Sequence, residues 1–143
     1  MTKSDIDNWD APQWLRELLG KFDIEPCNIE NGLDKPWEGR VWLNPPSGLG
    51  AVPWLTKMAD KKMKGLAFLF ARTDSKWFHD EVFSKAVGVL FWQGRFPLMK
   101  NGQETDKIGS IGCCLVAYNI EEIALLATLD GQGKGRLVIP MAR

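Results

Sequence analysis

The run from Val41 to Gly48 limits most strongly what this chain can form. Three β-prone apolar residues lead to Asn44, and Pro45 and Pro46 follow directly. Proline fixes φ at about −65°, lacks a backbone N–H, and disfavours the helical conformation in the residue before it. The sequence therefore predicts a strand that ends at Asn44 in a stiff, non-helical loop. In open α/β sheets ligands bind at the carboxyl ends of strands, so we expect a binding site at this amide.

Strand-like and helix-like patterns alternate along the chain. The run 65–71 is continuously apolar, as in a strand that is buried on both faces. Asp10 followed by Pro12 predicts a helix start, with Asp10 as the N-cap, and Gly20 ends that helix. Further strands are expected at 22–27, 40–44, 87–92, 111–118 and 137–139, and further helices at 53 to about 64, 76–86 and 120–129. The segment 100–107 is expected to be a hairpin or recognition loop. These patterns predict an α/β fold.

Length and composition indicate one globular domain spanning residues 1–143. No apolar run approaches the roughly 20 residues of a membrane span, and no signal-peptide pattern is present, so we expect a cytoplasmic protein without membrane partners. The three cysteines have no disulfide spacing. His79, the single histidine, forms no metal-ligand pattern with them, so no metal site is expected.

Several motifs occur in an order that resembles one enzyme family. Asn44-Pro45-Pro46 is similar to the catalytic loop of amino-methyltransferases. The other matching stretches are Ala11-Pro12-Gln13-Trp14-Leu15, Ile24-Glu25-Pro26-Cys27, Gly32-Leu33, 37–42, 72–78 and Gly94-Arg95-Phe96. Together they resemble the phage DNA N-6-adenine methyltransferase family, over roughly Trp9 to Tyr118.

The resemblance implies a fold, an activity and an origin. It implies a single Rossmann-like methyltransferase domain with a mostly parallel sheet and helices on both faces. It implies transfer of a methyl group from S-adenosylmethionine to the N6 amine of adenine in duplex or single-stranded DNA. The expected setting is a bacterial host cell, with the protein encoded by a phage or prophage.

The resemblance also assigns catalytic and cofactor residues. Asn44 and the Pro45 carbonyl are expected to accept hydrogen bonds from the target amine, on a loop stiffened by Pro46. This draws the nitrogen towards a tetrahedral geometry and exposes its lone pair. The residues expected to bind the cofactor are Ala11, Pro12, Glu25, Cys27 and Asn44.

A second set of residues is expected to bind DNA. Ser47 stands where the family has an aromatic residue that stacks on the flipped base. Serine cannot stack, so Trp54, the nearest aromatic in sequence, or Phe96 is expected to take over. Arg72 and Arg95 follow predicted strands and are candidates for phosphate contacts.

The chain also departs from the family near the cofactor region. The segment 28–36 is shorter than the family's, Asn31 replaces an aspartate before Gly32, and a glycine-rich first loop is absent. A second hypothesis is therefore a non-catalytic, methyltransferase-derived module that binds DNA or protein. A third is a methyltransferase acting on a small molecule or a protein amide.

Charge limits the strength of DNA binding. The formal net charge is zero, so modest and salt-dependent affinity is expected. Lys57, Lys61, Lys62 and Lys64 form a basic side on a predicted helix. They are either a solvated face or phosphate contacts.

Overall fold

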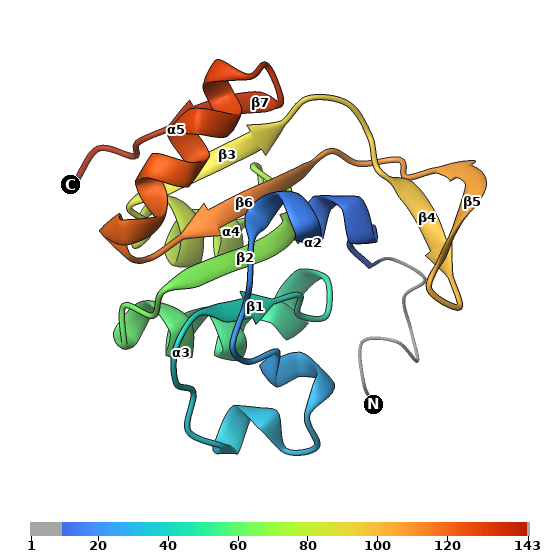
Figure 1. The fold of residues 1–143 in the computed structure, drawn as a ribbon. Helices are drawn as coiled ribbons and strands as arrows, with labels where there is room; N and C mark the ends of the chain where they lie inside the picture. Colours follow the sequence, from blue (N-terminus) through green and yellow to red (C-terminus); the bar gives the residue numbers. More distant parts are fainter. Residues whose placement is uncertain (1–9, 143) are drawn as a thin grey trace.

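The computed structural model describes residues 10–142 and contains a five-stranded sheet with the strand order β1-β2-β6-β3-β7 (Figure 1). The elements in chain order are α2 (Gln13–Leu19), η1 (Pro26–Asn28), η2 (Gly32–Asp34), β1 (Val41–Leu43), η3 (Gly48–Ala51), α3 (Val52–Asp60), β2 (Gly65–Phe70), α4 (Lys76–Phe78), η4 (His79–Phe83), β3 (Gly88–Trp92), β4 (Pro97–Lys100), β5 (Gln103–Ile108), β6 (Cys113–Ala117), η5 (Ile120–Glu122), α5 (Ile123–Gly131) and β7 (Gly135–Val138). Within residues 10–142, no helix combines the length and apolar character needed to cross a bilayer.

The sheet is mixed, which corrects the expectation of a mostly parallel, Rossmann-like sheet. β1 pairs with β2 in parallel. The other pairings, β2 with β6, β3 with β6 and β3 with β7, are antiparallel. The fold is therefore α/β with mainly antiparallel pairing.

The cause of the mixed pairing is the position of β6. The helical connections join strands of the same direction: α3 joins β1 to β2, and α4 with η4 joins β2 to β3. The chain then leaves β3 through the β4–β5 hairpin, without a helical crossover, and returns as β6 in the opposite direction. β6 inserts between β2 and β3, so two strands that point the same way have an antiparallel strand between them.

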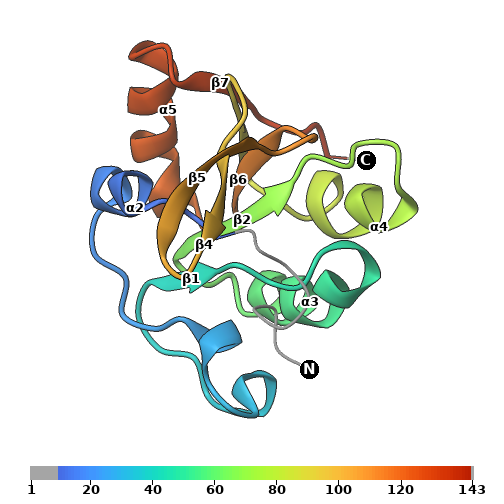
Figure 2. The ribbon, with the colours of Figure 1, turned by 90° about the vertical axis from the view of Figure 1, so that its right-hand side faces the viewer.

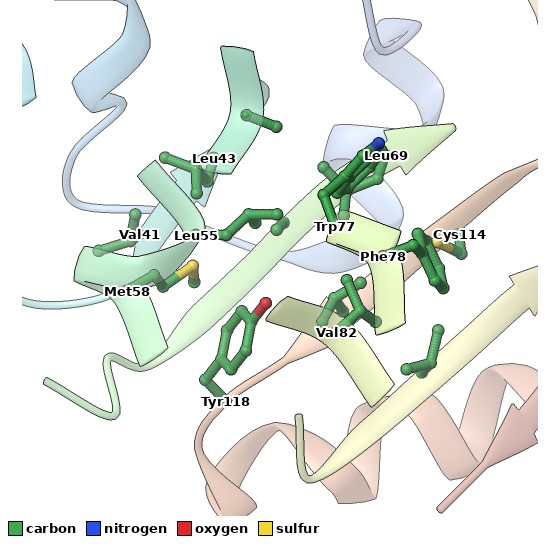
Figure 3. Packing of buried hydrophobic residues seen from close by; sticks show 14 of the residues in the cluster. Val41, Leu43, Leu55, Met58, Leu69, Trp77, Phe78, Val82, Cys114 and Tyr118 are labelled. Carbon is green, nitrogen blue, oxygen red and sulfur yellow. The ribbon is translucent and has the colours of Figure 1, made fainter. Parts of the chain in front are cut away.

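Helices cover both faces of this sheet (Figure 2). On one face, α3, α4 and η4 pack Leu55, Met58, Phe78 and Val82 against strand residues that include Leu69 (Figure 3). On the other face, α2 and α5 pack against alternate residues of the same strands, and the buried side chains there include Leu15, Leu19, Trp42, Phe68, Leu115, Leu126 and Leu129. The two faces alternate along each strand because successive side chains point to opposite sides.

Two predicted elements are shorter in the structure. The strand expected at 22–27 reduces to an isolated bridge between Ile24 and Val41, because Pro26 begins a 3₁₀ turn. The helix expected at 76–86 is the single α-helical turn α4, followed by the π-helical turn η4. The segment 100–107 forms most of the β4–β5 hairpin, which extends away from the main sheet (Figure 1).

A buried ion pair organises the edge of the sheet where β1 and β2 begin. The Glu122 carboxylate, 5% exposed, accepts hydrogen bonds from Arg40 Nε and Nη2, at 2.7–3.2 Å. It also accepts the Gly65 N–H at 2.9 Å. A Cβ on Gly65 would lie 1.9 Å from the Val41 carbonyl oxygen, so only glycine fits where β2 begins. Because Arg40 and Gly65 both donate to the Glu122 carboxylate, the burial of this charge is compensated by hydrogen bonds.

Candidate functional site

Three loops leave the main sheet on the side where β1, β2 and β3 end. We call this side, at the ends of the strands, the Asn44 edge. β1 and β2 are parallel, and β2 and β3 both run antiparallel to β6, so all three strands end on this side. The loops that follow them are 44–47, 71–75 and 93–96. This edge therefore gathers the predicted catalytic loop with both arginines that were expected to contact DNA.

Asn44 lies at the end of β1 with one half of its amide paired. The side chain is buried, at 7% exposure. Its Nδ2 donates a hydrogen bond to Asp10 Oδ1 at 3.0 Å. Its Oδ1 is buried and has no hydrogen-bond partner among residues 10–142. An unsatisfied buried acceptor costs about 1–3 kcal/mol, so this carbonyl is a feature that packing alone does not explain.

The start of α2 lies beside Asn44. Asp10 Oδ1 also accepts the Ala11 backbone N–H at 2.8 Å, so one oxygen joins this segment to the Asn44 amide. Pro12, and not Asp10, occupies the N-cap position, with no side-chain cap. The expected capping role of Asp10 is therefore wrong. The structure links the Ala11 backbone to Asn44 through Asp10, and the role of this segment in cofactor binding stays a prediction.

Glu25 adjoins β1 but is engaged with protein groups. The Trp42 N–H donates to the Ile24 carbonyl at 2.9 Å, which fixes this segment along β1. Glu25 Oε1 accepts from Arg16 Nη1 at 3.1 Å and from Asn28 Nδ2 at 3.3 Å. Cys27 lies in the 3₁₀ turn η1 that follows. One carboxylate oxygen of Glu25 is thus already used by two donors.

Phe96 is a packing residue. It is 6% exposed, stacks on Trp14 at a centroid distance of 5.7 Å, and meets the Phe68 ring edge-on at 5.2 Å. Stacking on a base requires at least one free face of the aromatic ring. Because Phe96 is buried among other aromatic rings, it does not offer an accessible face for the role that we expected.

Arg95 and Trp54 also contact protein groups. Arg95 Nη1 donates to the carbonyl oxygens of Gly109 and Ser110, which fastens the loop after β3 to the chain before β6. Trp54 stacks on Trp37 at 6.2 Å and 11°. Trp54 is half-buried against Trp37, so it lacks the open ring face that base stacking requires, whereas Arg95 is exposed and only its Nη1 is held by the two carbonyl oxygens.

Arg72 is exposed at the Asn44 edge, as Arg95 is, and it lies 5.9 Å from the centroid of the Phe70 ring. Phe70 and Trp77 line a small hollow together with Pro45, Pro46 and Ser47. Figure 3 shows Trp77 beside Leu69, at the end of β2. Phe70 and Trp77 are thus aromatic residues that share this hollow with Ser47, and neither was assigned to the site from the sequence.

The missed residues had other obvious interpretations in the sequence. Phe70 ends an apolar strand, and Trp77 begins an amphipathic helix, so both are expected core residues. Asp10 precedes Pro12 and fits a helix cap. A sequence signal for the Asp10–Asn44 contact does not exist, because these residues are 34 positions apart.

The predicted basic side of α3 lies at the opposite edge of the sheet. The lysines follow α3 to the start of β2, and Lys57 Nζ donates to the Leu33 and Lys35 carbonyl oxygens at 2.8 and 2.5 Å. Lys64 pairs with Glu121 at 3.2 Å. These lysines are therefore separated by the length of β2 from the loop that contains Asn44.

Other reactive side chains are not prepared for catalysis. Burial raises the pKa of Cys113 to about 12, although nearby Arg95 opposes this shift. Burial also raises the pKa of Cys114. Both thiols are therefore protonated at neutral pH, whereas a nucleophilic cysteine needs the thiolate. Within residues 10–142, no group of three or more His, Cys, Asp and Glu side chains is arranged to hold a metal ion.

Comparisons of the chain with models of known protein families, with curated proteins and with solved structures return no match. The resemblance to the phage methyltransferases thus stays a prediction from the sequence motifs.

Proposed function

We propose that this protein transfers a methyl group from S-adenosylmethionine to the N6 amine of adenine in DNA. The observation that carries the proposal is the buried, unpartnered Oδ1 of Asn44, at the end of β1. An exocyclic amine presents N–H donors, which are the groups that this acceptor lacks. The motif order in the sequence supports adenine as the target.

Asn44 is suited to orient an amine and not to deprotonate it. An amide oxygen accepts a hydrogen bond without being a strong base, so the proton leaves after the nitrogen has gained its methyl group. As the nitrogen becomes tetrahedral, its hydrogen bond to Oδ1 strengthens, which stabilises the transition state more than the bound substrate. The Pro45 carbonyl is the proposed second acceptor. Pro45 and Pro46 limit the loop's freedom, so little ordering remains for the reaction itself.

One part of the region assigned to the cofactor is compatible with cofactor binding, and another part is occupied by protein groups. S-adenosylmethionine supplies an electrophilic methyl group when bound. Ala11 and Pro12 adjoin Asn44 through Asp10, and they would hold the cofactor next to the amine acceptor. Glu25 has one oxygen bonded to Arg16 and Asn28, so it would bind the cofactor through its other oxygen.

DNA binding on this proposal is modest. A base in a duplex must be flipped out to reach Asn44, at a cost of a few kcal/mol, whereas single-stranded DNA avoids most of this cost. Arg72 supplies an exposed positive charge beside the loop. Phe70 and Trp77 line the hollow at Ser47, but its volume of about 10 Å³ holds no more than a water molecule, so a base does not fit there without movement of these side chains.

The test is calorimetric titration with S-adenosylmethionine, followed by methyl transfer from labelled cofactor to adenine-containing oligonucleotides. We expect cofactor binding, and we expect Asn44→Ala to lower turnover by about 10²–10³ while cofactor affinity is retained. Asn119→Ala is the matched control, because Asn119 follows β6 at the opposite edge of the sheet. Unchanged turnover in Asn44→Ala, with normal cofactor affinity, would refute the role of this amide.

A second candidate function is a non-catalytic, methyltransferase-derived binding module. It is favoured by the protein contacts of Glu25 and by the complete burial of Asn44 Oδ1, both of which hinder access by ligands. No heat at saturating cofactor concentrations, combined with retained binding to DNA, would favour this module over the enzyme.

A further inference from the structure

Asp10 and Asn44 form a contact whose direction is fixed by chemistry. An ionised carboxylate has only acceptor atoms, whereas the amide of asparagine has an NH₂ donor on one side and an oxygen acceptor on the other. The amide must therefore turn its Nδ2 to Asp10, as the 3.0 Å hydrogen bond requires. Its Oδ1 then faces away from the carboxylate, where it lies buried without a partner.

We propose that Asp10 is a positioning residue that fixes the orientation of the Asn44 amide, with Nδ2 on Asp10 and the acceptor oxygen Oδ1 left for the target amine. The orientation itself depends only on the Asp10–Asn44 contact. Its consequence for catalysis rests on the proposed function.

The lock also joins two segments that are distant in sequence. The same Asp10 oxygen accepts the Ala11 N–H at 2.8 Å and the Asn44 Nδ2 donor at 3.0 Å. Ala11 leads into α2, while Asn44 ends β1. A single oxygen therefore holds the proposed amine acceptor in register with the proposed cofactor segment.

Losing the lock would affect orientation more than affinity. Without Asp10, the amide can rotate by about 180°, because the terminal torsion of asparagine is broad and roughly two-fold. The rotated amide presents N–H donors where an amine also presents donors, and two donors do not pair. We expect Asp10→Ala to lower kcat by about ten- to a hundredfold, by analogy with outer partners that orient metal ligands, with cofactor affinity little changed.

The direct test is NMR of the Asn44 side-chain amide in ¹⁵N-labelled protein. In the wild type, we expect slower exchange of these NH₂ protons with water than for Asn101, which lies exposed in the β4–β5 turn. Asp10→Ala should accelerate this exchange and shift the resonances. Asp10→Asn should preserve most of the protection, because its amide still offers an acceptor oxygen. Asp130→Ala is the control, because Asp130 Oδ2 likewise accepts a backbone N–H, from Leu137, but on α5.

Two results would overturn the proposal. One is wild-type Asn44 exchange as fast as that of Asn101, which also remains decisive if Asp10→Ala does not fold. The other is an Asn44 amide that is unchanged in folded Asp10→Ala.

A double-mutant cycle tests whether Asp10 affects turnover through Asn44: Asp10→Ala should have little further effect on turnover in the Asn44→Ala background. Additive losses would contradict action through Asn44. If the wild type lacks methyl transfer but its Asn44 amide is protected and responds to Asp10, the enzymatic function fails and the orientation of the amide stands.

Discussion

Polar groups at the two edges of the main sheet differ in how completely they are hydrogen-bonded. At the edge where β1 and β2 begin, the Glu122 carboxylate is surrounded by donors from Arg40 and Gly65. Asn119, on the same side, donates to the Lys62 carbonyl and accepts the Glu121 N–H. At the other edge, Asn44 keeps a buried carbonyl oxygen that has no hydrogen-bond partner in the part of the chain that the structure describes.

The difference separates structural polar groups from candidates for function. Asn119 and Asn44 both follow an apolar strand, after β6 and β1, so their sequence contexts are alike. Asn119 uses both halves of its amide on the protein. Asn44 uses one half, and the unpaired half is destabilising unless another molecule satisfies it. The Asn44 edge is therefore distinguished by an amide with an unpaired oxygen, and not by the type of residue.

The largest effect on stability is expected at the fully paired edge. Glu122→Ala removes the partner of the partly buried Arg40 and of the Gly65 N–H, so we expect a loss of about 3–5 kcal/mol in the free energy of unfolding, measured in urea. Glu121→Ala is the matched control, since its pair with Lys64 is solvent-exposed and worth about 0–1 kcal/mol. Equal losses in both variants would show that the two carboxylates do not differ as described.

A smaller effect distinguishes the two asparagines. Asn119→Ala loses a side-chain cap of η5 and should destabilise the protein by about 1 kcal/mol. Asn44→Ala loses the bond to Asp10 but also removes the unsatisfied carbonyl, and these effects oppose one another. We expect a smaller change in the urea midpoint for Asn44→Ala than for Asn119→Ala. The reverse order would indicate that Oδ1 is stabilised within the protein itself.

The smallest expected effect concerns DNA and rests on the proposed function. Arg72→Ala should reduce the slope of log affinity against log salt by about one unit, because Arg72 is exposed at the Asn44 edge. The Lys61→Ala/Lys64→Ala double variant should leave that slope unchanged, because these lysines lie at the opposite edge. Fluorescence titration at several salt concentrations measures both slopes. A reduced slope in the lysine variant alone would move the DNA surface away from Asn44.

Local patterns predicted the local structure around Asn44. The strand Val41–Leu43, its end at Asn44 and the non-helical Pro45–Pro46 segment follow from side-chain and proline stereochemistry, and the structure confirms them. The apolar run from 65 became β2, buried along most of its length. Such features depend on neighbouring residues, so the sequence contains the needed information.

The order and direction of the strands in the sheet could not be predicted from local patterns. The run that became β6 is as apolar as a parallel central strand, and nothing in residues 113–117 reveals their direction. Direction was decided by the β4–β5 hairpin, which replaces the helix that a parallel connection requires. The segment 100–107 was expected to be a hairpin or recognition loop, but the mostly parallel sheet was taken from the family resemblance, which did not include the reversal of direction that the hairpin makes.

The site residues show the same division. The resemblance assigned Ala11, Pro12 and Asn44 to one site, but the link from Ala11 to Asn44 through Asp10 depends on long-range folding. Phe96, Trp54 and Arg95 were assigned to binding from residue type, whereas burial, ring stacking and carbonyl contacts occupy them in the structure. Exposure and prior partners decide availability, and neither can be read from a single sequence.

The insertion of β6 has a consequence for the order of folding. β2 and β3 do not pair with each other; each pairs directly with the antiparallel strand β6, which lies between them. The middle of the sheet therefore cannot close until residues 113–117 have been synthesised, because the strand that joins the two halves comes late in the chain. During synthesis, β2 and β3 expose unpaired backbone groups in the nascent protein, which makes this interval the stage most open to chaperone binding or to mispairing.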